Sequence, residues 1–407
     1  MKFVKYLPQF GWEPIILTVR NGDYSAIDQS LRSDIPNGIK IFSTDYFSPF
    51  VVYKPLVGLK KDTRLPTALL TKNSVGFRNK LASWIRRNLF IPDARIGWLP
   101  QGVQTGNKLI KRFKPAVIFS TSPPPTVHLI GLILSKLHRL QWVADFRDPW
   151  TNIYHYAASP RLGVVNWIDA QLEKKVLAAA DRVTVVGNNF FDCEPVIKTV
   201  VIPNGYDLDD VKRQSRRAVN LKFIIRYMGS FKSRQYVPVF FTLLEELSQN
   251  ADYKRNISVE FIGQVDPDII RKIKARKIPV EIKFHGYLDH NRAVELITNA
   301  NMLLFIIGRS AKANLIVTGK LFEYLMTGNP ILAYGPRAGA ANTILEKTGS
   351  GRMFDYDNIR SARDYLIKYY ELWKQGEYYS CGNFDQNTKF DRRILTRKLV
   401  NVFEELR

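Results

Sequence analysis

Short apolar segments alternate with amphipathic segments along nearly the whole chain of 407 residues, and this alternation limits the possible fold more than any other feature. The apolar segments have the length of buried strands, and the segments between them repeat their apolar residues with the spacing of a helix. Parallel sheets produce this pattern, because each crossover helix covers one face of the sheet. We therefore predict an α/β protein built from doubly wound, Rossmann-like sheets.

The predicted elements fall into two series, separated by a polar and basic stretch without an apolar period, residues 207–218. This stretch predicts the junction of two domains, for which 407 residues are ample. The strands expected in the first series are Glu13–Val19, Ala116–Ser120, Gln141–Asp145, Arg182–Val186 and Val200–Pro203. Those expected in the second series are Lys222–Gly229, Ser258–Gly263, Glu281–His285, Met302–Ile307, Pro330–Tyr334 and Gly351–Phe354. The expected helices include Thr126–Leu137, Val164–Ala180, Val237–Gln249, Asp266–Ala275, Asn291–Asn299, Lys320–Met326 and Asn342–Glu346.

The segment TGKLFEYLMTGNPILAYG, residues 318–335, carries the clearest sign of a ligand. Gly319 and Lys320 stand at the start of its predicted helix, between two apolar strands. The start of a helix attracts anions, because its first N–H groups are unpaired and the helix dipole is positive there. One turn further, Glu323 can accept hydrogen bonds from sugar hydroxyls. Phosphate and ribose are two parts of a nucleotide, so the segment predicts a nucleotide-sugar pocket.

The net charge of +23 is distributed unevenly. Between residues 51 and 115, 14 lysines and arginines stand against two acids, a net charge of +12. Such a patch indicates an anionic partner, which can be a phosphate-rich substrate, an anionic lipid surface or nucleic acid.

The two cysteines, Cys193 and Cys381, form neither a CxxC pair nor a metal-ligand spacing. This usage favours a reduced compartment. No apolar run is long enough to predict a transmembrane helix, and the N-terminus does not have the pattern of a signal peptide. We expect a cytoplasmic protein, and a peripheral position on the inner face of the cell membrane stays open.

Residues 76–90, GFRNKLASWIRRNLF, predict an amphipathic helix with an apolar stripe and basic residues off that stripe. Such a helix fits an anionic membrane surface. It can equally pack its stripe on the core and leave its basic face in water, and the sequence leaves both possibilities open. Its aromatic residues are not interleaved on the basic face, which argues against nucleic acid as the partner.

Five motifs occur in order along the chain: VADFRDPW (143–150), VIPNGYD (201–207), YMGSF (227–231), HGYLDH (285–290) and GKLFEYLMTGNPIL (319–332). Together they resemble the GT-B glycosyltransferases of family four over nearly the whole chain. The resemblance implies two Rossmann-like domains with a central cleft, and retaining sugar transfer that needs neither metal nor cofactor. It also implies an acceptor-side domain (1–206), a nucleotide-sugar-binding domain (207–385) and a C-terminal helix (386–407) that packs back on the first domain.

The chain departs from this family at two places. Family members usually begin with a strand and a glycine-rich loop, whereas this chain opens with the helix-like segment KFVKYLPQFG. We favour the explanation that the chain is a fragment, and the alternative is a rearranged sheet. Many members also carry two glutamates eight positions apart in the donor site. Glu323 matches the second, but Leu315 stands at the first, so that contact is missing or comes from Asn314 or Thr318.

The donor-binding residues follow from the resemblance. Glu323 is expected to hold the ribose hydroxyls, and Gly319 with Lys320 the diphosphate. Arg234 matches the phosphate-contacting arginine or lysine of the family and would neutralise the leaving diphosphate. The complete expected set is Gly229, Ser230, Lys232, Arg234, Thr318, Gly319, Lys320 and Glu323. A surface glutamate, a solvated lysine and a charged turn without a ligand are the alternative explanations.

The catalytic residues expected on the acceptor side are Asp145, Arg147, Asp148 and His128. The first three follow a strand and should face the cleft, where Asp148 would orient the acceptor hydroxyl and Arg147 would contact the donor phosphate. They can instead form an internal ion-pair network. His128 lies in the first turn of a helix and can equally be a buried structural histidine. Asn204–Gly205 predicts a structural turn, since this pair tolerates positive φ.

We therefore expect a hexosyltransferase-like enzyme that moves a sugar from a nucleotide-sugar donor to a glycan or lipid-linked acceptor, in polysaccharide or cell-envelope biosynthesis. One alternative is a sugar-nucleotide epimerase of the same fold, which product analysis would separate. Another is a non-catalytic binder of anionic membranes or nucleic acid. A salt titration of RNA binding beside vesicle flotation would separate those two.

Overall fold

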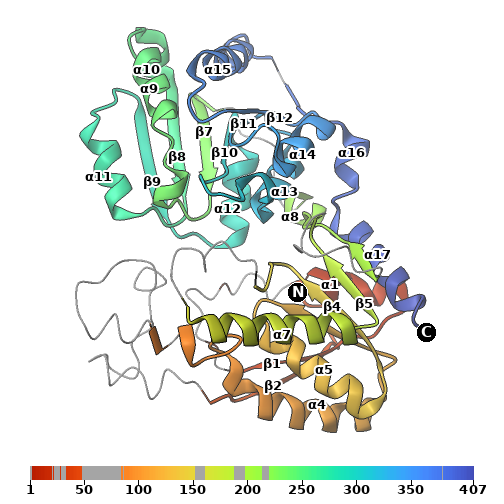
Figure 1. The fold of residues 1–407 in the computed structure, drawn as a ribbon. Coiled ribbons are helices and arrows are strands. Elements are labelled where there is room, and N and C mark those ends of the chain that lie inside the picture. Colours follow the sequence, from red (N-terminus) through yellow and green to blue (C-terminus); the bar gives the residue numbers. More distant parts are fainter. Residues whose placement is uncertain are drawn as a thin grey trace.

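The computed structural model describes residues 2–20, 22, 28, 34–47, 84–85, 87–151, 161–187, 198–212, 220–377 and 379–407. The described chain forms an upper half, built mainly from residues after 207, and a lower half that contains both termini (Figure 1). Cys193 and most of the predicted amphipathic helix 76–90 lie outside the described residues. None of the described helices is long and apolar enough to cross a membrane.

Six parallel strands form the sheet of the upper half, in the order β12-β11-β10-β7-β8-β9. Its strands are β7 (Phe223–Met228), β8 (Ile257–Ile262), β9 (Glu281–Gly286), β10 (Met302–Ile306), β11 (Ile331–Tyr334) and β12 (Gly351–Phe354). The series begins in the middle of the sheet and winds outward in both directions, which is a doubly wound topology. Strands β8, β10 and β11 are buried at every residue, as expected for a sheet covered on both faces.

Helices cover both faces of this sheet and give it two cores. Phe240 of α9 (Pro238–Leu247), Ile269 of α11 (Pro267–Ala275) and Leu366 of α15 (Ile359–Lys374) belong to one core. Ile297 and Leu345 belong to the other core, on the opposite face, together with buried residues of a third helix. The three helices of that second core are α12 (His290–Thr298), α13 (Gly319–Thr327) and α14 (Ala340–Thr348). The remaining elements are α8 (Leu208–Lys212), η5 (Ser233–Gln235), α10 (Ala251–Asn256), η6 (Ala313–Leu315) and α16 (Phe384–Thr388).

The described strands of the lower half form two separate parallel sheets, β1-β2 and β3-β4-β5-β6. The strands are β1 (Ile15–Val19), β2 (Lys40–Thr44), β3 (Val117–Ser122), β4 (Gln141–Phe146), β5 (Arg182–Val185) and β6 (Thr199–Val201). The helical elements are α1 (Lys2–Tyr6), η1 (Leu7–Phe10), η4 (Ile96–Trp98), α4 (Leu99–Phe113), α5 (Thr126–His138), α7 (Gly163–Ala179) and α17 (Arg392–Glu404). Parallel sheets with helices in both halves confirm the predicted fold class.

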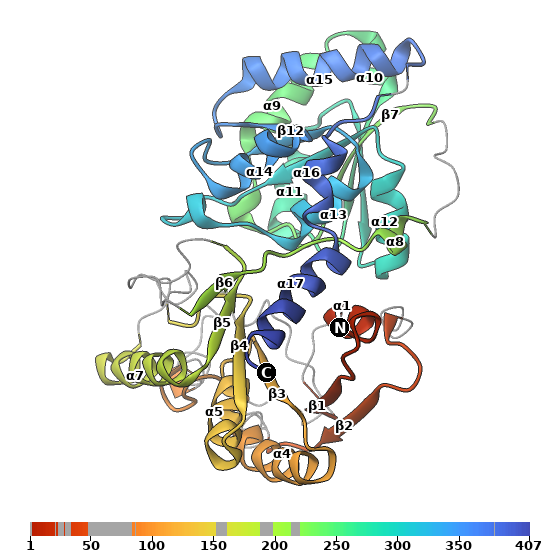
Figure 2. The same ribbon diagram turned by 90° about the vertical axis from the view of Figure 1, so that its right-hand side faces the viewer.

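The tail returns from the upper half to the lower half (Figure 2). Its helix α17 packs Leu399 and Phe403 into a core that also contains Leu7 and Val143. The tail therefore ends on the first half of the chain, beside strands β3 and β4 and the N-terminal helices.

The tail passes against the turn at Gly205 on its way to the lower half, and this contact explains the glycine. The backbone N–H of Tyr206 donates to the carbonyl oxygen of Phe390 at 3.0 Å. A Cβ on Gly205 would lie 2.1 Å from that same oxygen. Neither Asn204 nor Gly205 has a positive φ, so this turn does not use the backbone conformation that the pair tolerates. The turn needs glycine because the backbone of the tail at Phe390 packs directly against it.

Candidate functional site

Helix α13 begins at the carboxyl edge of the upper sheet, in the chain that follows β10. The side chain of its N-cap residue, Thr318, makes no cap hydrogen bond. Within the described structure, the buried hydroxyl of Thr318 has no hydrogen-bond partner. A Cβ on Gly319 would meet no atom within 4 Å, so the space beside this helix start is open. An uncapped helix start that faces open space is suited to an anion.

The ammonium group of Lys320 lies beside the end of strand β7. It donates to the hydroxyl of Tyr227 at 2.6 Å and lies 4.2 Å from the centroid of that ring. It also lies against Gly229, where a Cβ would come within 3.2 Å of the lysine Nζ. Burial lowers the pKa of Lys320 to about 8, although the carboxylate of Glu323 opposes this effect. A partly desolvated cation of this kind is a strong partner for a phosphate.

Glu323 lies one turn after Lys320, and its side chain is half-buried. Burial raises the pKa of its carboxyl group, while the positive charges of His290, Lys320 and Arg392 oppose that rise. His290 begins helix α12 and binds the Asp210 carboxylate at 3.0 Å, a hydrogen bond that raises the pKa of its imidazole. The negative charge of Asp210 adds to the rise. The Glu323 carboxyl group thus lies among charged groups of both signs, and its oxygens can accept hydrogen bonds from ligand hydroxyls.

The loop after β7 carries Ser230, Lys232 and Arg234, and all three are exposed. This loop is held against the loop after β10, the neighbouring strand. A Cβ on Gly308 would come within 3.0 Å of the Cβ of Arg234, and Arg309 donates its N–H to the Arg234 carbonyl at 3.3 Å. The predicted phosphate contacts of both loops therefore lie at one edge of the sheet, the edge where α13 begins.

Position 315 carries no group that could replace the expected first glutamate, because Leu315 is an exposed aliphatic side chain. Its neighbour Asn314 packs against the loop before α14, where a Cβ on Gly339 would lie 3.2 Å from the Asn314 Cα. Asn314 is exposed, whereas the orphaned hydroxyl of Thr318 is buried at the helix start. Of the two predicted substitutes, Thr318 is the one with a buried polar atom that has no hydrogen-bond partner in the described site.

The pair Asp145–Arg147 is already saturated with hydrogen bonds. Arg147 donates to both oxygens of Asp145, at 2.8 and 2.7 Å, and the carboxylate also accepts from Thr121 and Thr184 at 2.6 Å each. A further bond joins the guanidinium to the carbonyl of Ile202 at 2.9 Å. The pair thus ties β3, β4, β5 and the chain after β6 together, as in the ion-pair alternative.

The other two predicted catalytic residues lie in contrasting surroundings. Asp148 is exposed. His128 is completely buried, and its ring nitrogens bond to the hydroxyls of Ser120 and Ser122 at 2.8 Å each. Burial lowers the pKa of His128 to about 3, so the ring is neutral at physiological pH. This is the geometry of a structural histidine, and it places His128 apart from the residues around α13.

Arg392, at the start of α17, stands between the polar groups of the two halves. Burial, together with the positive charge of Arg147, lowers the pKa of its guanidinium to about 10. The carboxylates of Glu323 and Asp145 act in the opposite direction. Arg392 was not predicted, because no motif surrounds it and only the bridge between Tyr206 and Asp391 brings it here. His290 was also not predicted as a site residue, although it ends the HGYLDH motif.

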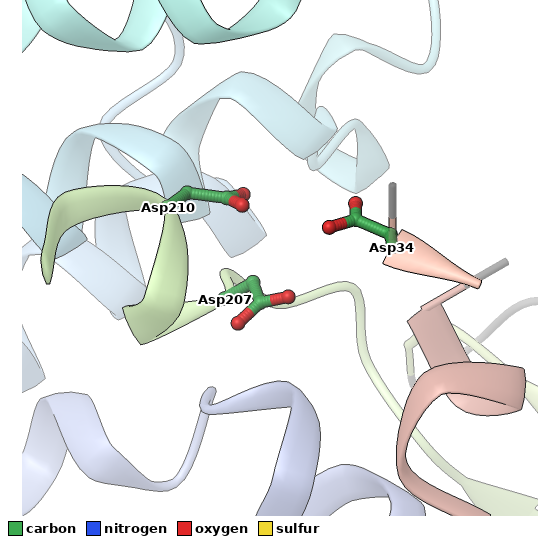
Figure 3. Close-up of side chains that lie close together, drawn as sticks. All are labelled: Asp34, Asp207 and Asp210. Carbon is green, nitrogen blue, oxygen red and sulfur yellow. The ribbon is translucent and has the colours of Figure 1, made fainter. Parts of the chain in front are cut away.

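Three buried carboxylates, Asp34, Asp207 and Asp210, point toward a shared space near the junction of the halves (Figure 3). The Nζ of Lys2 lies 2.7 Å from Asp34, 2.9 Å from Asp207 and 3.0 Å from Asp210. Burial lowers the pKa of Lys2, but hydrogen bonds to Asp34 and Asp207 outweigh this effect and raise it. The ammonium therefore takes the position that a metal ion would need, and the cluster works as an ionic link between α1 and α8.

The sequence matches no protein-family model and no curated protein. The structure is similar to HepE of Anabaena in complex with UDP, at 11% identity and a TM-score of 0.60 over 96% of this chain and 100% of HepE. It is also similar to sucrose-phosphate synthase of Thermosynechococcus elongatus, at 13% identity and a TM-score of 0.61 over 100% and 92%. A third similar structure is a UDP-forming α,α-trehalose-phosphate synthase of Burkholderia vietnamiensis. It has 9% sequence identity and a TM-score of 0.55 over 96% of this chain and 99% of the synthase. These neighbours are GT-B glycosyltransferases, and the likeness shows that this chain has the GT-B fold.

Proposed function

We propose that this protein is a glycosyltransferase that moves a sugar from a nucleotide-sugar donor to a glycan or lipid-linked acceptor. The observation that carries the proposal is the arrangement of Lys320, Gly229 and Glu323 around the open, uncapped start of α13. This arrangement offers a cation and free N–H groups for a diphosphate, and a carboxylate one helical turn away for a ribose. The likeness to HepE, which was solved with UDP, supports a nucleotide ligand.

In this proposal the diphosphate lies at the start of α13, against Gly229 and Lys320. Transfer breaks the bond between the sugar and the donor phosphate and forms a bond to the acceptor oxygen. Positive charge from Lys320 and Arg234 stabilises the leaving diphosphate, so the step needs no metal ion. We adopt the retaining, front-face course from the family resemblance, in which a donor phosphate oxygen helps to remove the acceptor proton.

The acceptor is proposed to enter from the lower half, which we assign to residues 1–206, while residues 207–385 bind the donor and 386–407 return to the lower half. Asp148 is the exposed carboxylate nearest in sequence to the Asp145–Arg147 pair, and we assign it the orienting role. Asp145 and Arg147 are positioning residues, since their hydrogen bonds are used within the fold. Polysaccharide or cell-envelope assembly in the cytoplasm, at a membrane surface, is the proposed setting.

A panel of UDP-, GDP- and ADP-sugars in a thermal-shift assay tests the donor site. A genuine donor at about 100 times its dissociation constant stabilises a protein by roughly 2.7 kcal/mol. The Lys320→Met and Glu323→Gln variants should lose this stabilisation. Lys274→Met, which changes an exposed lysine on α11, should keep it.

Product analysis with the selected donor then separates transfer from its alternative. A glycosylated acceptor supports the proposal, whereas a free epimerised sugar nucleotide contradicts it. Absence of any shift with the whole panel, at concentrations that stabilise a known nucleotide-sugar enzyme, would also overturn the donor site.

A further inference from the structure

The start of helix α7 presents large apolar side chains to solvent. Val164 is 60% exposed and Trp167 is 63% exposed. Leu162, just before the helix, is 45% exposed. The other side of the same helix is buried through Val165 and Val176, so α7 has an apolar face that packs on the core and a second apolar face that nothing in the described chain covers.

A second segment extends this outer face. The backbone N–H of Leu162 donates to the side-chain oxygen of Asn88 at 2.8 Å, and the Asn88 amide donates to the carbonyl of Trp84 at 2.9 Å. These bonds hold Trp84 and Asn88 beside the start of α7. Trp84 is 45% exposed and Leu89 is 63% exposed. Two tryptophans and three aliphatic side chains therefore share one region of the surface.

Polar contacts beneath this region link its two segments. Arg161 donates to the carbonyl of Arg87 at 3.0 Å and to the buried carboxylate of Asp169 at 2.6 Å. The same carboxylate accepts the indole N–H of Trp150 at 2.8 Å. The two segments are thus linked by buried polar contacts beneath the exposed apolar side chains.

The lysines and the acids of α7 lie on different sides of the helix. Lys174 and Lys175 are exposed further along the outer side. Both acids of the helix face the protein, because Asp169 is buried and Glu173 binds the hydroxyl of Thr151. The outer side of the described helix therefore offers apolar groups and lysines to a partner, and no exposed carboxylate.

We propose that this surface docks on an anionic membrane. The docking face comprises Trp84, Leu89, Leu162, Val164, Trp167, Lys174 and Lys175. Tryptophan rings favour the headgroup level of a bilayer, and lysines beside them attract anionic lipids. The described residues of this face include two exposed lysines and no exposed acid, so the face is complementary to a sheet of negative charge, which a lipid surface supplies. The inference extends the proposed lipid-linked acceptor, but membrane binding can be measured without donor or acceptor.

The full chain is tested by flotation with neutral phosphatidylcholine vesicles and with vesicles that contain about 30% phosphatidylglycerol, a charged surface of the kind that attracts lysines. The chain should bind only the anionic vesicles, and brominated acyl chains should quench its tryptophan fluorescence. Lys174→Gln with Lys175→Gln should lower the partition coefficient about 30-fold, which corresponds to about 1 kcal/mol for each lysine. Val164→Ser with Trp167→Ser should lower it at least about tenfold, because these are the most exposed apolar side chains of α7 and their area is no longer transferred into the bilayer.

Matched controls remove equivalent groups from the upper half. Leu221→Ser removes a side chain that is 93% exposed, and Lys254→Gln with Lys274→Gln removes two exposed lysines. These variants should bind vesicles like the original chain. Equal binding to neutral vesicles, no vesicle binding, or docking-face variants that bind normally would overturn the inference. Evidence that these residues mediate self-association or RNA binding instead would also overturn the inference. Docking-face variants should keep the thermal shift that the donor causes. If no donor in the panel causes a shift, the proposed glycosyltransferase function is refuted, but the membrane-docking inference is not.

Discussion

Lys320 should make the affinity for a nucleoside diphosphate depend on pH in a window where few other side chains titrate. Burial lowers its pKa to about 8, whereas a solvated lysine has a pKa of about 10.4. A bound diphosphate places negative charge beside the ammonium and moves this pKa back towards the ordinary value. Above pH 8, binding must therefore be accompanied by the uptake of a proton.

The magnitude follows from the fraction of lysine that is already charged. At pH 7 about nine tenths of the free Lys320 side chains are protonated, and at pH 9 about one tenth are, given a pKa of about 8. The affinity should therefore fall about tenfold between these pH values, or about 1.4 kcal/mol. The sign is fixed: a group whose pKa rises on binding supports binding below its free pKa, and this support is lost as the pH rises through it. The phosphate itself is fully ionised above about pH 7.5, since its second pKa is about 6.

Isothermal titration with UDP, repeated between pH 7.5 and 9 in two buffers of different ionisation enthalpy, measures both the affinity and the proton uptake. The Lys320→Met variant should bind weakly at pH 7.5 and lose most of the pH dependence. Lys274→Met should behave like the original chain, because that lysine is exposed on α11. A constant affinity across this range, or a slope that survives in Lys320→Met, would refute the reasoning.

Three other substitutions test particular contacts. Gly319→Ala should leave thermal unfolding unchanged, because its Cβ meets no atom within 4 Å. It should still weaken diphosphate binding in a titration, and unchanged affinity would place the anion elsewhere. Gly205→Ala should lower the free energy of unfolding in urea by about 1–3 kcal/mol, since the new Cβ would lie 2.1 Å from the Phe390 carbonyl oxygen. Asp207→Asn should destabilise the protein at neutral pH: burial alone would raise the pKa of Asp207, but hydrogen bonds from Lys5, Tyr6 and Lys2 hold it well below its usual range. The stabilisation is present above about pH 4 and is lost as the pH falls towards the lowered pKa, so urea titrations of both proteins should converge in acid.

The strands of the sheets could be predicted because their signal is local. Each predicted strand is present, with ends that differ by at most two residues. Strand β2 was missed because Lys40–Thr44 contains two apolar residues, and one of them, Ile41, is 47% exposed. Helix α4 was not predicted either, and it contains two glycines. A Cβ on Gly102 would lie 2.5 Å from Ile130, so the glycine reflects close packing against α5, which no local pattern reveals.

The secondary structure around the predicted donor residues was predictable for the same reason, since a strand, a loop and a helix start lie within one short segment around Lys320. The contacts of the predicted acceptor-side residues were not predictable in this way. Whether Asp145 is free for chemistry depends on Thr121 and Thr184, which come from the two neighbouring strands. Arg392 reaches the site only because the tail crosses between the halves. These facts depend on tertiary contacts that the residue types at those positions do not determine.

The charged residues at the junction of the two halves interact electrostatically with the Glu323 carboxyl group. Lys2 of the lower half binds Asp210 of α8, and Asp210 binds His290, whose charge acts on Glu323. Positive and negative groups alternate along this path, so each member favours the charged form of its neighbours, and the pKa of His290 is raised by Asp210 and Glu323 despite burial. Loss of Asp210 would remove the carboxylate between Lys2 and His290 and so weaken the stabilisation of both positive charges. In the proposed enzyme, the charges around Glu323 therefore depend on the position of the lower half, which supplies Lys2.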